Sequence, residues 1–101
     1  INNDELKAKD EELHCDDFRA LVKDHYEKIE KSDAVLVLNY DKRGVKNYIG
    51  SSAFCEITYA LAENKKIYLY NEIPDMKYIS GDLGCFDVII LNGDLTKIEN
   101  V

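Results

Sequence analysis

The sequence predicts an α/β domain built around a parallel sheet of three strands. Three apolar runs support this: "AVLVLNY" from Ala34, "KIYLYN" from Lys66 and "FDVIIL" from Phe86. The first run is continuous rather than alternating, which is typical of a strand that is covered on both faces of a parallel sheet. A helical segment separates the first two runs, as a crossover between parallel strands requires. At 101 residues, the chain is long enough for a single domain over residues 1–101.

The first predicted element is a helix from Asn3 to about Lys31. Apolar side chains recur there at three- and four-residue spacings and predict one apolar face: Phe18, Leu21, Val22, Tyr26 and Ile29. Lys, Asp and Glu fill the other face. The first dozen residues carry few apolar side chains, so we expect that end of the helix to be loose. Ser32 and Asp33 end the helix and lead into a strand at about residues 34–39.

A second helix is predicted at about residues 52–64, as the crossover between the first two strands. Phe54, Ile57 and Leu61 mark its apolar side, and Asn64 with two lysines suits its end. The second strand follows at about residues 67–71. A loop or short helical turn then leads to the third strand, at about residues 87–91. We expect these three strands to lie side by side and parallel.

The start of the chain is unusual for this class, because a doubly wound domain usually begins with a strand rather than a helix. The first residue is Ile1. We therefore expect a three-layer, flavodoxin- or Rossmann-like parallel sheet that is truncated at the N-terminus and lacks one strand and one helix. The sheet edge beside strand 34–39 would then be uncovered, and we expect the chain to associate.

The charge and hydropathy of the chain limit its partners. Its formal net charge is −7, which repels phosphate backbones, so we expect no nucleic-acid partner. The net charge does not exclude small anionic ligands, because local backbone dipoles can outweigh it. No apolar run approaches the length of a membrane span, and no signal peptide is visible. We expect a cytoplasmic protein without a membrane partner.

Cysteine and histidine usage predicts neither a disulfide framework nor a metal site. Cys15, Cys55 and Cys85 are odd in number and widely spaced, without a CxxC pair. Free thiols in a reducing compartment are the simpler expectation. His14 and His25 stand eleven residues apart, without clustered cysteines or carboxylates. We expect no metal and no cofactor.

The loop after the first strand is the expected ligand-binding edge. In open α/β sheets, ligands bind at the carboxyl ends of the strands. The loop from Asp41 to Ser52 follows the first strand, and Glu56 lies in the first or second turn of the next helix. On a helical wheel Glu56 projects away from the apolar side. A solvated glutamate favoured by the helix dipole explains this spacing, and a carboxylate in a ligand site is the alternative.

Two segments resemble a known family. "GSSAFCEITYALAENKKIYLYN" combines a small-residue turn with a glutamate at a helix start, an aromatic–alanine pair and a strand, and "SDAVLVLNYD" is an Asp-Ala-apolar strand before it. Together they resemble the nucleoside 2-deoxyribosyltransferase family. The resemblance extends from about Asp33 to Asn71, with weaker agreement in "VIILNGDL".

The resemblance implies an enzyme of nucleoside or nucleotide metabolism, either a transferase or an N-glycosidase. Glu56 falls on the family's nucleophile. A carboxylate there attacks the anomeric carbon to form a covalent sugar ester, which a second base or water resolves. Asp41 is our candidate for protonating the leaving base or gripping a sugar hydroxyl, with an ordinary turn aspartate as the equal alternative. In this family a neighbouring subunit commonly completes the pocket, so a homo-oligomer is one of the expected partners.

Further residues are candidates for binding the small-molecule substrate. The turn of Gly50, Ser51 and Ser52 brings backbone N–H groups toward a phosphate or sugar oxygen, although a serine as N-cap is the commoner use. Asn39 and Asn47 are candidates for sugar hydroxyls, with turn formation as the alternative. Two tyrosines, Tyr48 and Tyr59, are candidates for stacking on a base, with packing as the alternative. Cys55 is expected to be a small core residue.

A second hypothesis is a protein of the same fold that has no catalytic activity. Gly50 stands where many family members carry an acidic or hydroxyl residue, Ile57-Thr58 replaces an apolar–glycine pair, and the family's first strand and glycine-rich turn have no counterpart. These departures favour a non-catalytic nucleotide-binding or interaction module, whereas the retained Glu56 favours the enzyme. A flavodoxin-type phospho-acceptor domain fits poorly, because Asp41 is the one acidic residue that qualifies at the strand ends.

Overall fold

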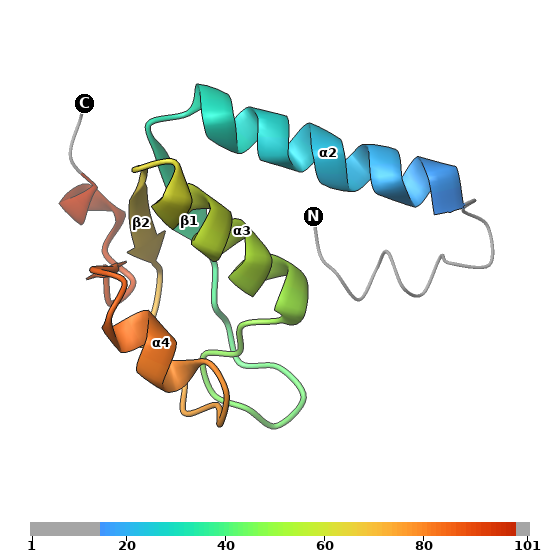
Figure 1. Cartoon of the computed structure of the whole chain (residues 1–101). Helices are drawn as coiled ribbons and strands as arrows, with labels where there is room; N and C mark the ends of the chain where they lie inside the picture. Colours follow the sequence, from blue (N-terminus) through green and yellow to red (C-terminus); the bar gives the residue numbers. More distant parts are fainter. Residues whose placement is uncertain (1–14, 99–101) are drawn as a thin grey trace.

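The computed structural model describes residues 15–98, and its elements alternate between helix and strand along the chain (Figure 1). They are helix α2 (Cys15–Lys31), strand β1 (Ala34–Val37), helix α3 (Ser51–Ala62), strand β2 (Lys66–Leu69), helix α4 (Ser80–Gly84), strand β3 (Ile89–Ile90) and the 3-10 turn η1 (Leu95–Lys97). The predicted helix start at Asn3 and its loose end lie outside the described residues. Within residues 15–98, every helix is too short or too polar to cross a membrane.

The strands form one parallel sheet in the order β1–β2–β3. Val35 pairs with Ile67, and Tyr68 pairs with both Leu36 and Ile89. α3 connects β1 to β2, so the predicted parallel arrangement and its crossover helix are confirmed. A small α/β domain is thus established for the described residues, and the three-layer arrangement stays a prediction.

The strands are shorter than predicted, most of all β3, which contains two residues instead of five. Asp87 adopts a left-handed backbone conformation with φ of 55°, which a strand cannot contain. Beyond Leu91, Asn92 and Gly93 also have positive φ values, 51° and 77°, and they turn the chain away. The apolar run therefore marks the strand correctly but overstates its length.

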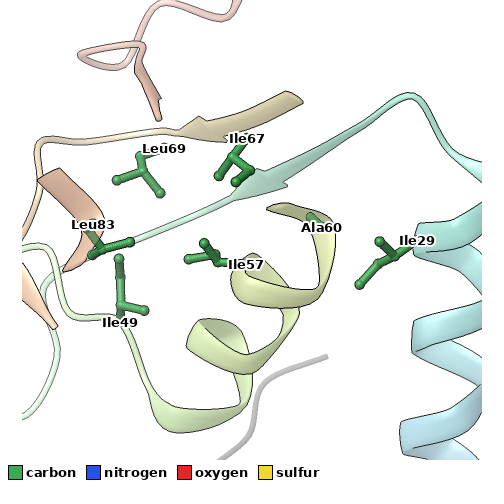
Figure 2. Close-up of a cluster of buried hydrophobic side chains, with 7 residues drawn as sticks. All are labelled: Ile29, Ile49, Ile57, Ala60, Ile67, Leu69 and Leu83. Carbon is green, nitrogen blue, oxygen red and sulfur yellow. The ribbon is translucent and has the colours of Figure 1, made fainter. Parts of the chain in front are cut away.

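A cluster of buried side chains fills the space between α3 and one face of the sheet (Figure 2). Its members come from α2, α3, α4, β2 and the loop before α3: Ile29, Ile49, Ile57, Ala60, Ile67, Leu69 and Leu83. Two expectations about α3 were wrong. Leu61 is 39% exposed, because the buried stripe of α3 runs through Ile57 and Ala60 instead. Cys55 is exposed rather than a core residue, because it lies off that stripe.

The other face of the sheet is less well covered. Successive side chains of a strand point to opposite faces, so Tyr68 points away from the cluster that contains Ile67 and Leu69. Tyr68 is buried, but its register partners Leu36 and Ile89 are exposed. The expectation that both faces of the first strand are covered is therefore wrong at Leu36.

Helix α2 packs on α3 through its C-terminal half. Ile29 belongs to the buried cluster, and the Tyr26 ring stacks on the Tyr59 ring of α3 with centroids 4.4 Å apart. Toward the N-terminus of α2, Val22 is exposed although it belongs to the predicted apolar face. α2 thus contacts α3 closely near its end and leaves space beside β1 near its start.

Candidate active site

A cavity of about 890 Å³ lies at the carboxyl end of β1, bounded by α2, by the loop after β1 and by the first two turns of α3. Glu56, Asp41 and the turn of Gly50, Ser51 and Ser52 all line it. The structure therefore brings together the two predicted catalytic carboxylates and three of the five predicted substrate-binding residues. Asn39 and Asn47 lie outside the cavity lining.

Glu56 is bonded to His25, a residue far from it in the sequence. The Nδ1 atom of His25 on α2 lies 2.8 Å from Oε1 of Glu56 on α3. The two side chains are 23% and 34% exposed, respectively, so the pair is partly shielded from solvent. Since an ionised carboxylate can only accept, His25 donates through an N–H on Nδ1 when Glu56 is charged.

The position of His25 follows from the spacing of α2. His25 comes four residues after Leu21, which also lines the cavity, and four residues before the buried Ile29. Residues four apart share one face of a helix, so the face that docks α2 also presents His25 to α3. The signal for His25 was therefore present: it lies within the predicted apolar face, where a polar residue needs a partner.

Asp41 contributes both to the cavity and to the loop that surrounds it. Its Oδ1 accepts a hydrogen bond of 3.0 Å from the backbone N–H of Asn47. Asn47 itself has φ of 59°, a left-handed conformation that asparagine tolerates better than most residues. Asn47 thus forms the turn, which was the alternative to a role in binding sugar hydroxyls. Asp41 is exposed and lines the cavity.

Asn39 is fully buried and joins the ends of β1 and β2. Its Nδ2 donates to the carbonyl oxygens of Asn71 at 3.1 Å and Glu72 at 3.0 Å, and its Oδ1 accepts from the Asn71 N–H at 2.8 Å. Asn71 returns a bond from its own Nδ2 to the Asn39 carbonyl, at 3.1 Å. Because the Asn39 amide is engaged at both atoms, this residue supports the sheet end from which the loop departs.

The start of α3 differs from the predicted serine cap. Gly50 is the N-cap residue, and no side chain caps the helix, so neither Ser51 nor Ser52 has that role. A Cβ at Gly50 would lie 3.4 Å from the ring of Tyr48, which shows how closely this turn passes the tyrosine. Tyr48 also lines the cavity, as a base-stacking residue would.

The side chain of Tyr59 lies in the interface between α2 and α3. Its ring stacks on Tyr26, and its hydroxyl donates to the carboxylate of Glu30. That hydrogen bond, with some burial, raises the pKa of Tyr59 to about 12. Burial, followed by the nearby Cys55 and Glu56, raises the pKa of Tyr26 as well. For Tyr59 the packing alternative is therefore the one the structure supports.

The chemistry available at this cavity is that of carboxylates and a histidine. Across residues 15–98, no group of three or more histidine, cysteine, aspartate or glutamate side chains is arranged to hold a metal ion. Asp41 and Glu56 supply two carboxylates, and His25 supplies an N–H donor to one of them. A carboxylate in this setting can act as a nucleophile, while a second one handles protons or hydroxyl groups.

Fold and site together define a small α/β domain with a carboxylate-lined cavity at the carboxyl end of a parallel strand. Comparisons with protein-family models, with curated proteins and with solved structures found no match for this chain.

Proposed function

We propose that this protein transfers or hydrolyses the N-glycosidic bond of a nucleoside or nucleotide, with Glu56 as the nucleophile. One observation carries the proposal: the Glu56 carboxylate lines the 890 Å³ cavity beside Asp41 and is bonded to His25 at 2.8 Å. A cavity of this size is within the range of small-molecule sites. Its location agrees with the general position of ligands in open α/β sheets, and thus with a flavodoxin- or Rossmann-like arrangement.

The proposed reaction begins with attack of a Glu56 oxygen on the anomeric carbon of the sugar. The bond from that carbon to the base nitrogen breaks, its electron pair leaves with the base, and a glycosyl ester of Glu56 remains. Asp41, in its protonated form, supplies the proton that the departing base takes up, or grips a sugar hydroxyl. A second base or a water molecule then attacks the ester and frees the carboxylate.

Other lining residues have supporting roles in this proposal. The N-cap residue of α3 is Gly50, which has no side chain, so a sugar or phosphate oxygen can approach the backbone at the start of this helix. Tyr48 beside Gly50 is suited to stacking on a base. We propose the cytoplasm as the compartment, because three exposed free thiols are kept reduced there.

A binding module without catalysis is the second candidate. It is favoured by the bond between His25 and Glu56, since a carboxylate engaged in joining two helices serves the fold as well. In that case, the same cavity would hold a nucleoside or nucleotide and release it unchanged.

The proposal is tested by incubating the protein with 2′-deoxynucleosides and their 5′-monophosphates, with and without an acceptor base. We expect free base to appear, measured by liquid chromatography. Glu56→Gln keeps the shape of the side chain but is a far weaker nucleophile, so it should abolish release, as should Glu56→Ala. Because Glu56 is outside the buried cluster, both variants should unfold close to the wild-type temperature.

Glu63→Gln is the matched control, because Glu63 is an exposed glutamate at the end of the same helix and outside the cavity lining. It should release base at the wild-type rate. Release that persists in both Glu56 variants would remove Glu56 as the nucleophile. Ligand binding by calorimetry without any base release would favour the binding module.

A further inference from the structure

We propose that His25 is a positioning residue for Glu56: its Nδ1–H fixes Oε1 of the carboxylate and leaves Oε2 as the attacking oxygen. This inference rests on the proposed function of Glu56 as nucleophile. The observation behind it is the 2.8 Å contact between His25 Nδ1 and Glu56 Oε1 at the edge of the cavity that both residues line. A donor N–H bonds an ionised carboxylate more strongly than a neutral acid, and the nucleophile must be ionised.

Both partners stand on regular helices rather than on loops. His25 is anchored by Ile29, one turn further along α2, in the buried cluster. Glu56 is followed one residue later by Ile57, which is fully buried. Side chains on packed helices hold their geometry more closely than side chains on loops, so this contact is suited to fixing the direction of a carboxylate.

The stacked rings of Tyr26 and Tyr59 also join α2 to α3. Tyr26 follows His25 on α2, and Tyr59 lies three residues after Glu56 on α3, so the rings meet beside the histidine–glutamate pair. The hydrogen bond from Tyr59 to Glu30 also crosses from α3 to α2. Since these contacts already join the helices, the bond to Glu56 is not needed to dock α2.

The position of Glu56 in the second turn of α3 explains why its carboxylate needs a hydrogen-bond partner. The field of a helix N-terminus is felt mainly within the first turn, and Glu56 is the sixth residue of α3. A hydrogen bond from a neighbouring element therefore does more to orient this carboxylate than the helix dipole. A misplacement of a reacting group by about 1 Å can cost roughly 100-fold in rate, so fixing the carboxylate matters for turnover.

Three substitutions of His25 separate positioning from packing. His25→Asn keeps an N–H donor near the place of Nδ1, His25→Gln moves the donor to the place of Nε2, and His25→Leu removes it. With a 2′-deoxynucleoside as substrate, we expect His25→Leu and His25→Gln to lower kcat by about 100-fold with KM nearly unchanged. His25→Asn should recover most of the loss, and all three variants should keep the wild-type circular dichroism spectrum.

A second measurement does not depend on activity. We expect the nitrogen NMR spectrum of the wild type, at a pH where the ring is neutral, to show the proton on Nδ1 of His25. In Glu56→Ala the proton should redistribute toward Nε2, whereas Glu63→Ala should leave it on Nδ1. The His25 signal is assigned by its disappearance in His25→Asn.

The two measurements distinguish failure of the inference from failure of the function. An active wild type with the proton on Nε2, or with full kcat in His25→Leu, would overturn the positioning role and leave the proposed function standing. Equal loss in His25→Asn and His25→Leu would overturn it too. An inactive wild type with the proton on Nδ1 would overturn the proposed function and the positioning role together, leaving a structural bond between the helices.

Discussion

Asn39 shows at the scale of a single residue how a buried amide can hold a site without belonging to it. Its side chain bonds the backbone of Asn71 and Glu72 and is fully shielded from water. The loop that carries Asp41 leaves the sheet directly after it. The geometry of one wall of the cavity thus depends on hydrogen bonds of a residue outside the cavity lining.

Asn39→Leu should therefore destabilise the protein strongly. Leucine is close in size but leaves the Asn71 N–H and two carbonyl oxygens without their partner. Leaving buried polar groups unpaired costs about 1–3 kcal/mol each, so we expect the free energy of unfolding in urea to fall by about 3 kcal/mol or more. Asn71→Ala, which removes the single bond from Asn71 Nδ2 to the Asn39 carbonyl, should cost about 1 kcal/mol. Equal values for the two variants would contradict this account.

Part of the candidate site was predictable from the sequence. Glu56, Asp41 and the turn at Gly50 were placed at one sheet edge by a general rule of parallel sheets, and the structure puts them around one cavity. The contact of His25 with Glu56 joins residues 31 positions apart. Such a contact depends on how two helices pack, which no local pattern specifies.

Helix α3 is the element on which the core and the candidate site meet. Ile57 and Ala60 face the sheet and are fully buried, while Glu56 and Cys55 line the cavity. Leu61 belongs to neither side and is exposed at the surface. The same helix therefore offers a buried and an exposed aliphatic residue for comparison.

Ile57→Ala should cost about 2–5 kcal/mol of unfolding free energy, since it removes a buried side chain and leaves a cavity behind. Leu61→Ala should cost less than about 1 kcal/mol, because its side chain is already in contact with solvent. Thermal unfolding followed by circular dichroism measures both. A larger loss for Leu61→Ala than for Ile57→Ala would mean that the helix is rotated from its position in this structure.

The sequence predicted the type and order of the helices and strands better than it predicted their lengths. The continuous apolar runs gave three parallel strands and the periodicity of α3 gave the crossover, both as observed. The limits of β3 depend on the left-handed backbone at Asp87 and Asn92, and asparagine and aspartate adopt that conformation at only some of their positions. Hydrophobic runs report burial, so they cannot show where pairing in a sheet stops.

Within residues 15–98, β1 is the outermost strand at one side of the sheet. Leu36, Leu38 and Tyr40 are exposed on and after this strand, where they also line the cavity. An exposed edge with apolar side chains favours pairing with another chain. The association expected from the sequence remains a prediction, and these residues indicate where it would occur.

Leu38→Glu should weaken that association. A charge at the edge of a sheet disfavours pairing between molecules, so we expect the average mass in sedimentation equilibrium to fall toward that of a single chain. Leu95→Glu is the matched control, because Leu95 and Leu38 are both 53% exposed, whereas Leu95 belongs to η1 and Leu38 directly follows β1. A wild type that sediments as a single chain at all concentrations would refute the prediction.

The exposed thiol of Cys55 gives the cavity a built-in reporter. Cys55 lines the cavity beside Glu56, whereas Cys15 and Cys85 are exposed elsewhere, at the start of α2 and at the end of α4. A compound that occupies the cavity shields one thiol from alkylation and leaves two as internal standards. Occupancy can thus be read from the ratio of labelled peptides in a mass spectrum, even for compounds that the protein binds without changing.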